Sequence, residues 1–344
     1  MAYSTIIKPN TQMNPVTYTG NGTTQSITGV NFQPDFVWVK SRNFAEDHQL
    51  TDSVRGATKV IQSNLTDAES TMTGGLTSFD TDGFSVGNQS DFNYNGDALI
   101  SWNWKAGGSP SSNTDGSITS SVSVNTTAGF SIISWGGTDA NGTVGHGLGV
   151  APKMVLFKTR GVVEGWATYH ASVGATGSLP LNTTAAFTVS AYYYQNTNPS
   201  STVITVGAGT ANKNTPMIAY AFTDVKGFSK MGSYIGNGNA DGTFVYTGFK
   251  PSFIIWKNSS ASTQWVLLDN KRLGYNPSNY SLFPNNTDRD ADGSAISADL
   301  LSNGFKLRTT SEHDNQSGST FIYMAFAENP LVANTSGGIP TTAR

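Results

Sequence analysis

Three segments of the chain share a pattern in which a proline is followed by a run of apolar residues and, six positions after the proline, a lysine. They are residues 34–40 (PDFVWVK), 152–158 (PKMVLFK) and 251–257 (PSFIIWK). Runs rich in β-branched and aromatic residues favour strands, and a leading proline blocks the continuation of a helix. The pattern therefore predicts a buried strand at each of the three places.

Further landmarks recur around these strands at nearly constant offsets. Upstream of each proline, an aromatic residue followed by a Gly/Asn-rich turn opens the pattern, and these aromatics are Tyr18, Trp135 and Tyr234. Eight positions after the lysines lie His48, Trp166 and Trp265. Downstream, aromatic-rich strands close the pattern at 98–104, 217–222 and 321–326. This agreement predicts three diverged copies of one unit, with Trp166 and Trp265 in the cores of their units.

An Asp-x-x-Arg box follows in the first and third copies but not in the second. It consists of Asp52 with Arg55, and of Asp269 with Arg272. Because each aspartate precedes its arginine by only three residues, a local structural ion pair is the favoured interpretation. The alternative is that the two matching carboxylates cooperate in glycoside hydrolysis, which requires only that they lie close together in space.

These patterns together predict an all-β fold of three tandem antiparallel β-sandwiches of about 100 residues each. Residues 117–124 alternate apolar and polar side chains, and Asp82 with Gly83 and Asn303 with Gly304 are typical of hairpin turns. The expected organisation is an N-terminal docking arm (1–16), repeat 1 (17–107), a linker with repeat 2 (108–226), repeat 3 (227–330) and a C-terminal tail (331–344). The three repeats are called units 1, 2 and 3 below.

Other segments are expected to depart from the strand pattern. Residues 106–116 are rich in Gly, Ser and Pro, which predicts a flexible or extended joint that couples unit 1 weakly to the others. Clusters of Ala, Asp and Leu predict short helical turns near 66–72 and 295–301. The arm and the tail carry little charge or periodicity, so we expect them to order only on a partner.

Composition narrows the class of protein. Of the 344 residues only 12% are charged, about half the usual share of about 25%, whereas 18 Phe, 13 Tyr and 7 Trp are enough to fill cores. The net charge of −3 predicts no nucleic-acid partner. With no cysteine there is neither a disulfide nor a Cys-based zinc site. The N-terminus has no signal-peptide pattern and the longest apolar run is 217–222, so we expect synthesis in a cytoplasm and no membrane insertion.

The sharpest candidate for a bound ion is a run of alternating carboxylates in unit 3. Asp288, Asp290, Asp292 and Asp299 match the beginning and the twelfth position of a calcium loop. The final ligand is Asp rather than Glu, and the apolar Ile296 is one position late. A solvated polar turn is therefore the favoured interpretation, and calcium the alternative.

The remaining candidates are histidines and tyrosines. His48, His146, His170 and His313 have no carboxylate or histidine at metal-ligand spacing. His48 stands where the other units have tryptophan, which favours a packing role. Tyr192, Tyr193 and Tyr194 suit either a platform for stacking glycans or a strand buried by a neighbour. The sequence thus predicts no catalytic residue, no resident cofactor and no enzyme activity.

Longer motifs resemble a known family. Residues 18–22 (YTGNG), 30–42 (VNFQPDFVWVKSR) and 52–56 (DSVRG) resemble a repeat of virion proteins of tailed bacteriophages, notably marine phages. Residues 125–132 (NTTAGFSI) and 145–154 (GHGLGVAPKM) resemble the linker and second unit of the same family. The resemblance covers about residues 15–330. It implies lectin-like sandwiches of the jelly-roll or concanavalin type and a virion component, with no catalytic residue to carry over.

The resulting hypothesis is a non-enzymatic structural protein on the outside of a tailed-phage virion, as a head decoration or a fibre-like head or tail appendage. Its expected partners are other capsid or tail proteins and further copies of itself in a homo-oligomer, and its expected location is the virion surface after synthesis in the host cytoplasm. The alternative is a receptor-binding module that recognises a host surface glycan. A polysaccharide depolymerase is the less favoured third hypothesis.

Overall fold

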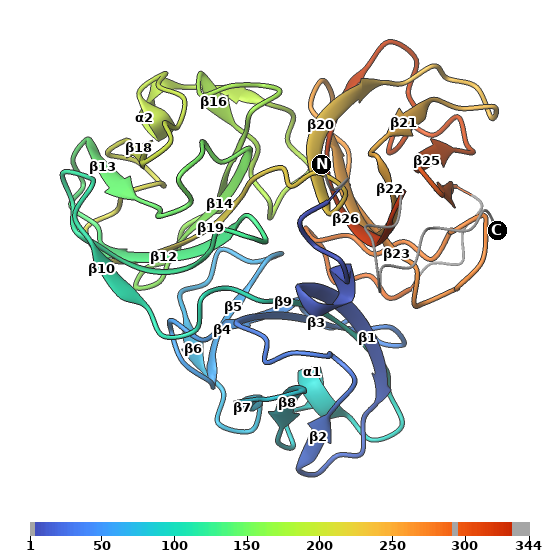
Figure 1. The fold of residues 1–344 in the computed structure, drawn as a ribbon, viewed down its shortest axis with the longest axis horizontal. Helices are drawn as coiled ribbons and strands as arrows, with labels where there is room; N and C mark the ends of the chain where they lie inside the picture. The colour runs from blue at the N-terminus through green and yellow to red at the C-terminus, as the bar shows by residue number, and fades with distance from the viewer. Residues whose placement is uncertain (1–3, 291–294, 332–344) are drawn as a thin grey trace.

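The computed structural model describes residues 4–290 and 295–331, and it shows an all-β protein. Every ladder between named strands is antiparallel; helical structure in the described residues is limited to η1 (Pro9–Thr11), α1 (Ser90–Asn93) and α2 (Ala191–Tyr194). None of the described helices has the length and apolar character needed to cross a membrane. Figure 1 shows three lobes arranged around a common centre, and these lobes, called lobes 1, 2 and 3, hold units 1, 2 and 3.

Lobe 1 is a sandwich of a large and a small sheet. The large sheet has the order β1-β9-β3-β4-β5-β6 and the small sheet the order β2-β8-β7. Apolar side chains such as Val37 and Phe84 fill the space between the two sheets. The strands are β1 (Met13–Thr19), β2 (Gln25–Ile27), β3 (Phe36–Ser41), β4 (Gln49–Asp52), β5 (Lys59–Gln62), β6 (Ser70–Thr71), β7 (Leu76–Asp80), β8 (Gly83–Val86) and β9 (Ala98–Trp104).

Lobe 2 also has a six-stranded large sheet, and it has two small ribbons in place of the small sheet. The large sheet has the order β10-β11-β12-β19-β14-β15, and the ribbons are β13-β18 and β16-β17. Val144 and Phe157 belong to the core of this lobe. The strands are β10 (Ser111–Asn113), β11 (Ser120–Asn125), β12 (Phe130–Gly136), β13 (Gly142–Gly145), β14 (Met154–Thr159), β15 (Ala167–His170), β16 (Gly177–Ser178), β17 (Thr188–Val189), β18 (Val203–Val206) and β19 (Pro216–Phe222).

Lobe 3 is a sandwich of sheets with the orders β20-β26-β22-β23 and β21-β25-β24. Its core includes Trp256 and Phe305, whose rings stack with centroids 6.2 Å apart. The ladder between β22 and β26 is irregular around Pro251, where the register shifts twice. The strands are β20 (Ser229–Ile235), β21 (Phe244–Tyr246), β22 (Phe249–Asn258), β23 (Trp265–Asp269), β24 (Ala298–Leu301), β25 (Gly304–Leu307) and β26 (Thr320–Pro330).

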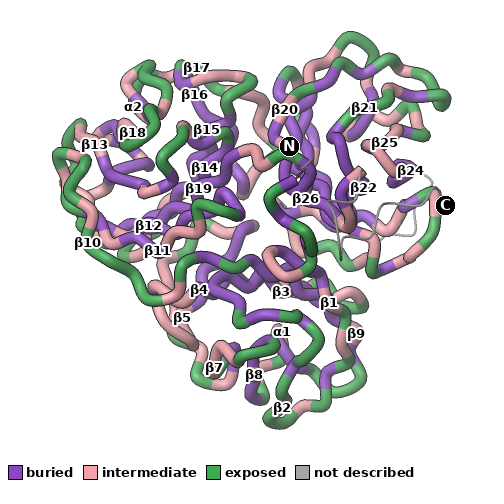
Figure 2. Tube along the Cα trace, viewed as in Figure 1, coloured by how far each residue is buried: buried purple, intermediate pink, exposed green. Residues whose placement is uncertain are grey.

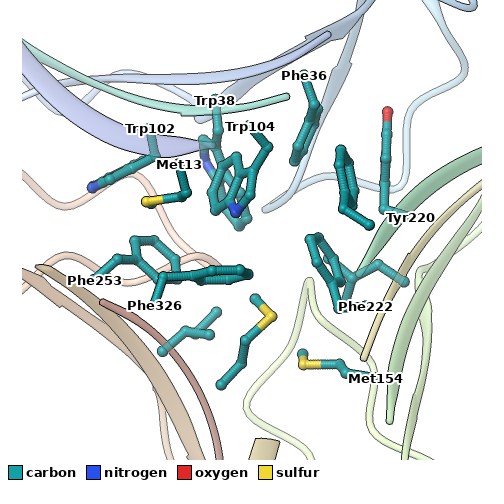
Figure 3. Close-up of a cluster of buried hydrophobic side chains, with 14 of the residues drawn as sticks. Met13, Phe36, Trp38, Trp102, Trp104, Met154, Tyr220, Phe222, Phe253 and Phe326 are labelled. Carbon is teal, nitrogen blue, oxygen red and sulfur yellow. The ribbon is translucent and has the colours of Figure 1, made fainter. Parts of the chain in front are cut away.

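The second face of each large sheet points to the centre of the molecule, where the three lobes share one apolar cluster. The last aromatic residues of the three closing strands, Trp104, Phe222 and Phe326, meet there. Their ring centroids form a triangle with separations of 6.3, 5.9 and 6.0 Å. Figure 3 shows them surrounded by side chains from all three lobes. The lobes are therefore joined by a common core rather than strung along the chain.

Burial on both faces explains why the proline-led strands are continuous apolar runs. In β3, Val37 and Val39 point into the core of lobe 1, and Phe36 and Trp38 point into the shared cluster. Every residue of β3 is buried, as is every residue of β14. Strands covered on both faces lose the alternation of a half-buried strand. In Figure 2 the inner strands of each lobe are accordingly almost entirely buried.

The N-terminal arm differs from the expectation that it orders only on a partner. Ile6 and Met13 are buried in the shared cluster, with 4% and 1% of their surfaces exposed. The expected boundary after residue 16 falls within β1, which pairs with β9 along its whole length. Residues 332–344 of the expected tail lie outside the described residues.

The expected joint at 106–116 is extended and held at its start. The Ala106 N–H donates to Asp35 over 2.7 Å, and the Gly107 N–H donates to Ser123 over 3.0 Å. Further along, β10 is an edge strand of the large sheet in lobe 2. Together with the shared core, these bonds argue against weak coupling of unit 1.

The two helical turns expected from composition are wrong. Residues 66–69 have no regular structure and lead into β6, and residues 298–301 form β24. Helix propensity is a weak preference that tertiary pairing overrides. The hairpin turns at Asp82 and Asn303 are confirmed, because they join β7 to β8 and β24 to β25.

Candidate functional site

Contacts between the lobes, rather than an open cleft, bring the candidate residues together. In lobe 1, Asp52 forms an ion pair with Arg55, and both side chains are completely buried. The hydroxyl of Tyr220, from β19 of lobe 2, donates to the same carboxylate over 2.7 Å. The Arg55 guanidinium also donates to the carbonyl oxygen of Leu50 over 2.9 Å. The box therefore lies in the junction between lobes 1 and 2.

Electrostatics keep the Arg55 guanidinium charged and the Tyr220 hydroxyl protonated. Burial alone lowers the pKa of Arg55, but the neighbouring charge of Asp52 raises it above its usual value. Burial raises the pKa of Tyr220 well above its usual value, so its hydroxyl stays protonated and acts as the donor to Asp52. A buried carboxylate is tolerated only when it is paired and hydrogen-bonded. Asp52 meets both conditions.

The second box has the same geometry between lobes 3 and 1. Arg272 Nε donates to Asp269 over 2.7 Å. The indole N–H of Trp102, from β9 of lobe 1, donates to the same carboxylate over 3.1 Å. Trp102 precedes the last aromatic of its strand by two positions, as Tyr220 does in lobe 2. The Arg272 guanidinium carbon also lies 5.9 Å from the centroid of the Trp102 ring, within the range of a cation–π contact.

Each box is extended by a further acid and by an arginine of the neighbouring lobe. At the junction of lobes 1 and 2, Glu69 accepts two bonds from Arg160, of 2.8 and 2.9 Å, and one of 3.2 Å from Arg55. At the junction of lobes 3 and 1, Asp290 pairs with both Arg42 and Arg272. In both cases the backbone N–H of the acid donates to the carbonyl oxygen of the neighbouring arginine. The two junctions therefore share the same arrangement of an Asp-x-x-Arg ion pair, a further acid and an arginine of the neighbouring lobe.

The third junction, between lobes 2 and 3, uses uncharged groups. His170 lies four positions after Trp166, where Asp52 and Asp269 lie four positions after His48 and Trp265. Its Nδ1 accepts the Ser172 N–H at 3.2 Å, so its Nε2 carries the proton and donates to the Tyr323 carbonyl oxygen of lobe 3 at 3.1 Å. The middle unit thus replaces the acidic box with a neutral histidine.

The residues eight positions after the lysines also make contacts between lobes, one for each pair of lobes. Trp166 donates its indole N–H to Gln62 O of lobe 1 over 2.9 Å. Trp265 donates to Pro180 O of lobe 2 over 3.0 Å. His48 Nε2 lies 3.0 Å from Phe283 O of lobe 3. The prediction that both tryptophans are buried is confirmed, because each is 1% exposed. They lie in the shared cluster, however, and not in the cores of their own units.

The three repeated lysines are buried without a carboxylate partner at hydrogen-bond distance among the described residues. Each lysine donates to a backbone carbonyl oxygen of the loop that follows its strand: Lys40 to Phe44, Lys158 to Glu164 and Lys257 to Ala261. Lys40 and Lys257 also donate to the last residues of their own strands, and Lys158 donates to Thr66 O of lobe 1. Burial lowers the pKa of each of them to about 8. Lysine at this position therefore fastens a loop, and its ammonium group is screened from solvent.

Each lobe contains a buried asparagine shortly before its closing strand that no sequence pattern had indicated. Asn93, Asn212 and Asn315 are completely buried, and their amides bind the turns that follow the opening aromatics. The available signal was their offset from the closing strand, but asparagine is so frequent in this chain that the spacing alone does not stand out.

The run of carboxylates in unit 3 is largely used in ion pairs. Asp290 pairs with two arginines, as described above, and Asp299 pairs with Arg308. Asp288 is exposed and accepts the side-chain amide of Asn286 over 2.8 Å. Asp292 lies outside the described residues. Within the described part of the chain, no group of three or more histidine, aspartate or glutamate side chains is arranged to hold a metal ion.

The remaining histidines and tyrosines separate into core and surface residues. Burial lowers the pKa of His146 and of His313 below the usual value for histidine, and both accept backbone N–H groups through Nδ1. Tyr194 is 1% exposed and packs in the core of lobe 2. Tyr192, by contrast, is 57% exposed, and its ring lies against Gly209. The run forms α2 rather than a strand.

Comparison with known proteins identifies one family. The chain matches the model of a family described as a domain of unknown function, DUF7483, over residues 8–330. No curated protein and no solved structure matches it. A single family model thus spans all three lobes, the ion-pair boxes between them and most of the arm. The chain belongs to the DUF7483 family.

Proposed function

We propose that this protein is a non-enzymatic structural component displayed on the outside of a tailed-phage virion, as a head decoration or a fibre-like appendage. One observation supports this function best: the two matched carboxylates, Asp52 and Asp269, are engaged in contacts between lobes. Each is buried, paired with arginine and bonded to an aromatic donor of the next lobe. Such a group stabilises a rigid body and offers no accessible acid or base to a substrate.

The motifs that resemble phage virion proteins provide the second line of support. On this proposal the three lobes are diverged copies of one lectin-like sandwich, and the partners are capsid or tail proteins. Low charge and the absence of cysteine suit a particle that is assembled in a reducing cytoplasm and then works outside the cell.

Electron microscopy of purified particles tests the location. A gold label attached at Arg344 is expected on the head or on the tail of intact virions, and its position distinguishes a decoration from an appendage. Particles that carry the protein on neither would contradict the proposal. Particles lacking the gene product are the control for label specificity.

Recognition of a host surface glycan is the second candidate function, and the exposure of Tyr192 favours it. An ideal Cβ on Gly209 would lie 2.2 Å from the Tyr192 ring, so only glycine lets the ring rest on this loop. A tyrosine held in this way can stack on a sugar. A glycan array probed with the natural protein and with Tyr192→Ala tests it. Tyr275→Ala is the matched control, because Tyr275 is an exposed tyrosine of lobe 3.

A further inference from the structure

A cleft of about 250 Å³ lies at the junction of lobes 1 and 3. Asparagine side chains dominate its lining and come from both lobes and from the arm. They are Asn10, Asn14, Asn31, Asn270 and Asn329. Lys271 and Glu328 also line the cleft, and Met13 contributes to it from the apolar side. Glu328 forms an ion pair of 2.7 Å with Lys250. None of the residues that line the cleft is aromatic.

Hydrogen bonds to the backbone fix the position of residues that line this cleft. Asp82 accepts the backbone N–H groups of Gly29 and Asn31 at 3.1 and 2.6 Å, which fixes the turn on the side of lobe 1. On the opposite side, Asp269 accepts the backbone N–H of Lys271 at 2.9 Å. Asn270 and Lys271 are the two middle residues of the Asp-x-x-Arg box. The ion pair that joins the lobes therefore also positions these two side chains.

The third side of the cleft is formed where the pairing of β22 with β26 is irregular. The register between β22 and β26 shifts on either side of Pro251, and Ser252 and Ala327 at this irregularity line the cleft. The corresponding ladders, β3 with β9 and β14 with β19, run without a register shift. Bulges that redirect side chains are frequent beside binding sites. The register shift beside the cleft is thus a feature of the ladder between β22 and β26 that the other two ladders do not share.

The polar groups of the cleft have unused hydrogen-bonding capacity. The side-chain oxygen of Asn270 is buried and has no hydrogen-bond partner among the described residues. Asn14 donates its amide N–H groups to Gly29 O and Val30 O, which fixes the amide and leaves its oxygen as an acceptor.

We propose that this cleft binds a single sugar residue. Amides act as both donors and acceptors, which is the pattern that adjacent sugar hydroxyls require. The size of the cleft suits one ring rather than a chain, and Lys271 and Glu328 bring one cationic and one anionic side chain to its lining. This inference deepens the second candidate function with a site separate from Tyr192. It does not depend on where the protein sits on a particle.

Titration of the full chain with methyl glycosides of glucose, galactose, N-acetylglucosamine and glucuronic acid tests the proposal. Ligand-observed NMR or calorimetry is expected to give saturable binding of at least one glycoside, with a dissociation constant on the order of 1 mM, as is usual for so small a polar ligand. Asn31→Gly and Lys271→Ala should each weaken it about tenfold, the effect of losing one or two hydrogen bonds. Asn31 has a positive φ of 72°, so glycine removes the amide without straining the turn.

Matched controls keep the test decisive. Asn196→Gly changes another asparagine of positive φ, in lobe 2, and Lys153→Ala removes an exposed lysine of the same lobe. Neither should alter binding, and all four variants should melt at the temperature of the natural protein. Absence of binding of every glycoside at millimolar concentration would overturn the proposal, as would equal binding by Asn31→Gly and Lys271→Ala. Failure here leaves the virion location, tested by labelling, unaffected.

Discussion

The hydroxyl of Tyr220 donates a hydrogen bond of 2.7 Å to Asp52, a residue 168 positions earlier in the chain and in another lobe. Trp102 and Asp269 make the corresponding contact between lobes 1 and 3. In both contacts an aromatic side chain of one lobe donates to the aspartate of a buried Asp-x-x-Arg ion pair in another lobe. The lobes are therefore held by specific polar ties in addition to the shared apolar cluster.

Removing the Tyr220 hydroxyl should weaken the junction between lobes 1 and 2. Tyr220→Phe keeps the ring, which stacks on Phe36 with centroids 4.3 Å apart, but leaves Asp52 with one donor fewer. The expected loss in the free energy of unfolding is about 1–2 kcal/mol, measured by denaturant titration. Tyr246→Phe, at an exposed position, should cost almost nothing. Equal stabilities for the two variants would mean that this bond contributes nothing.

Removing a box arginine should be much more costly. Arg55→Met leaves the Asp52 carboxylate buried without its cation, and Arg272→Met does the same to Asp269. Breaking a buried pair from one side costs about 3–5 kcal/mol. Lys230→Met is the matched control, because Lys230 pairs with Asp224 where the two side chains are 43% and 31% exposed. An exposed pair is worth about 0–1 kcal/mol. A box variant no less stable than the control would contradict the structural role of the box.

Acid should loosen the junction between lobes 2 and 3. Burial lowers the pKa of His170 to about 4, from about 6.5 in an unfolded chain. The unfolded state therefore binds the proton first as the pH falls. The stability that depends on the neutral ring is complete above about pH 6.5 and is lost progressively towards pH 4. The expected loss is about 3 kcal/mol.

Unfolding curves at pH 7 and at pH 4.5 measure this effect. His170→Gln removes the titrating group and should make stability less dependent on pH over this interval. Burial also lowers the pKa of His48 well below its usual value, so part of the acid sensitivity will remain in the variant. If the natural protein and the variant lose the same stability between the two pH values, His170 does not carry the effect.

The arm should contribute to stability through one isoleucine and not through its neighbour. Ile6 is buried in the shared cluster, whereas Ile7 is 46% exposed. Ile6→Ala should cost about 2–5 kcal/mol, the usual range for truncating a buried isoleucine. Ile7→Ala is the matched control and should cost far less. Thermal melting of the two variants compares them directly, and equal melting temperatures would place the arm outside the core.

The sequence predicted the strands well because the evidence for them is local. The proline-led runs correspond to β3, β14 and β22, and the closing runs to β9, β19 and β26. The continuous apolar pattern of β3 indicates burial on both faces, but it does not say what covers the second face. The shared cluster depends on contacts between distant segments, such as Trp104 with Phe326. No short-range pattern encodes such contacts.

The ion-pair boxes illustrate the same limit at the level of the site. The spacing of Asp52 and Arg55 predicted their local pairing, and the structure places them in an ion pair. The spacing did not predict the other partners of the pair, which are Tyr220 of lobe 2 and Glu69. His170 takes the position of the box aspartate in unit 2, but the change of residue type concealed the equivalence.

Scanning calorimetry on the natural protein and on Phe222→Ala tests the central claim, that the three lobes share one core. Phe222 lies at the centre of the molecule and touches the rings of Trp104 and Phe326. Truncating it should cost about 3–5 kcal/mol. We predict one cooperative transition for the natural protein, with equal calorimetric and van't Hoff enthalpies, that moves as a whole to lower temperature in the variant. Three separate transitions, of which only that of lobe 2 moves, would contradict the account.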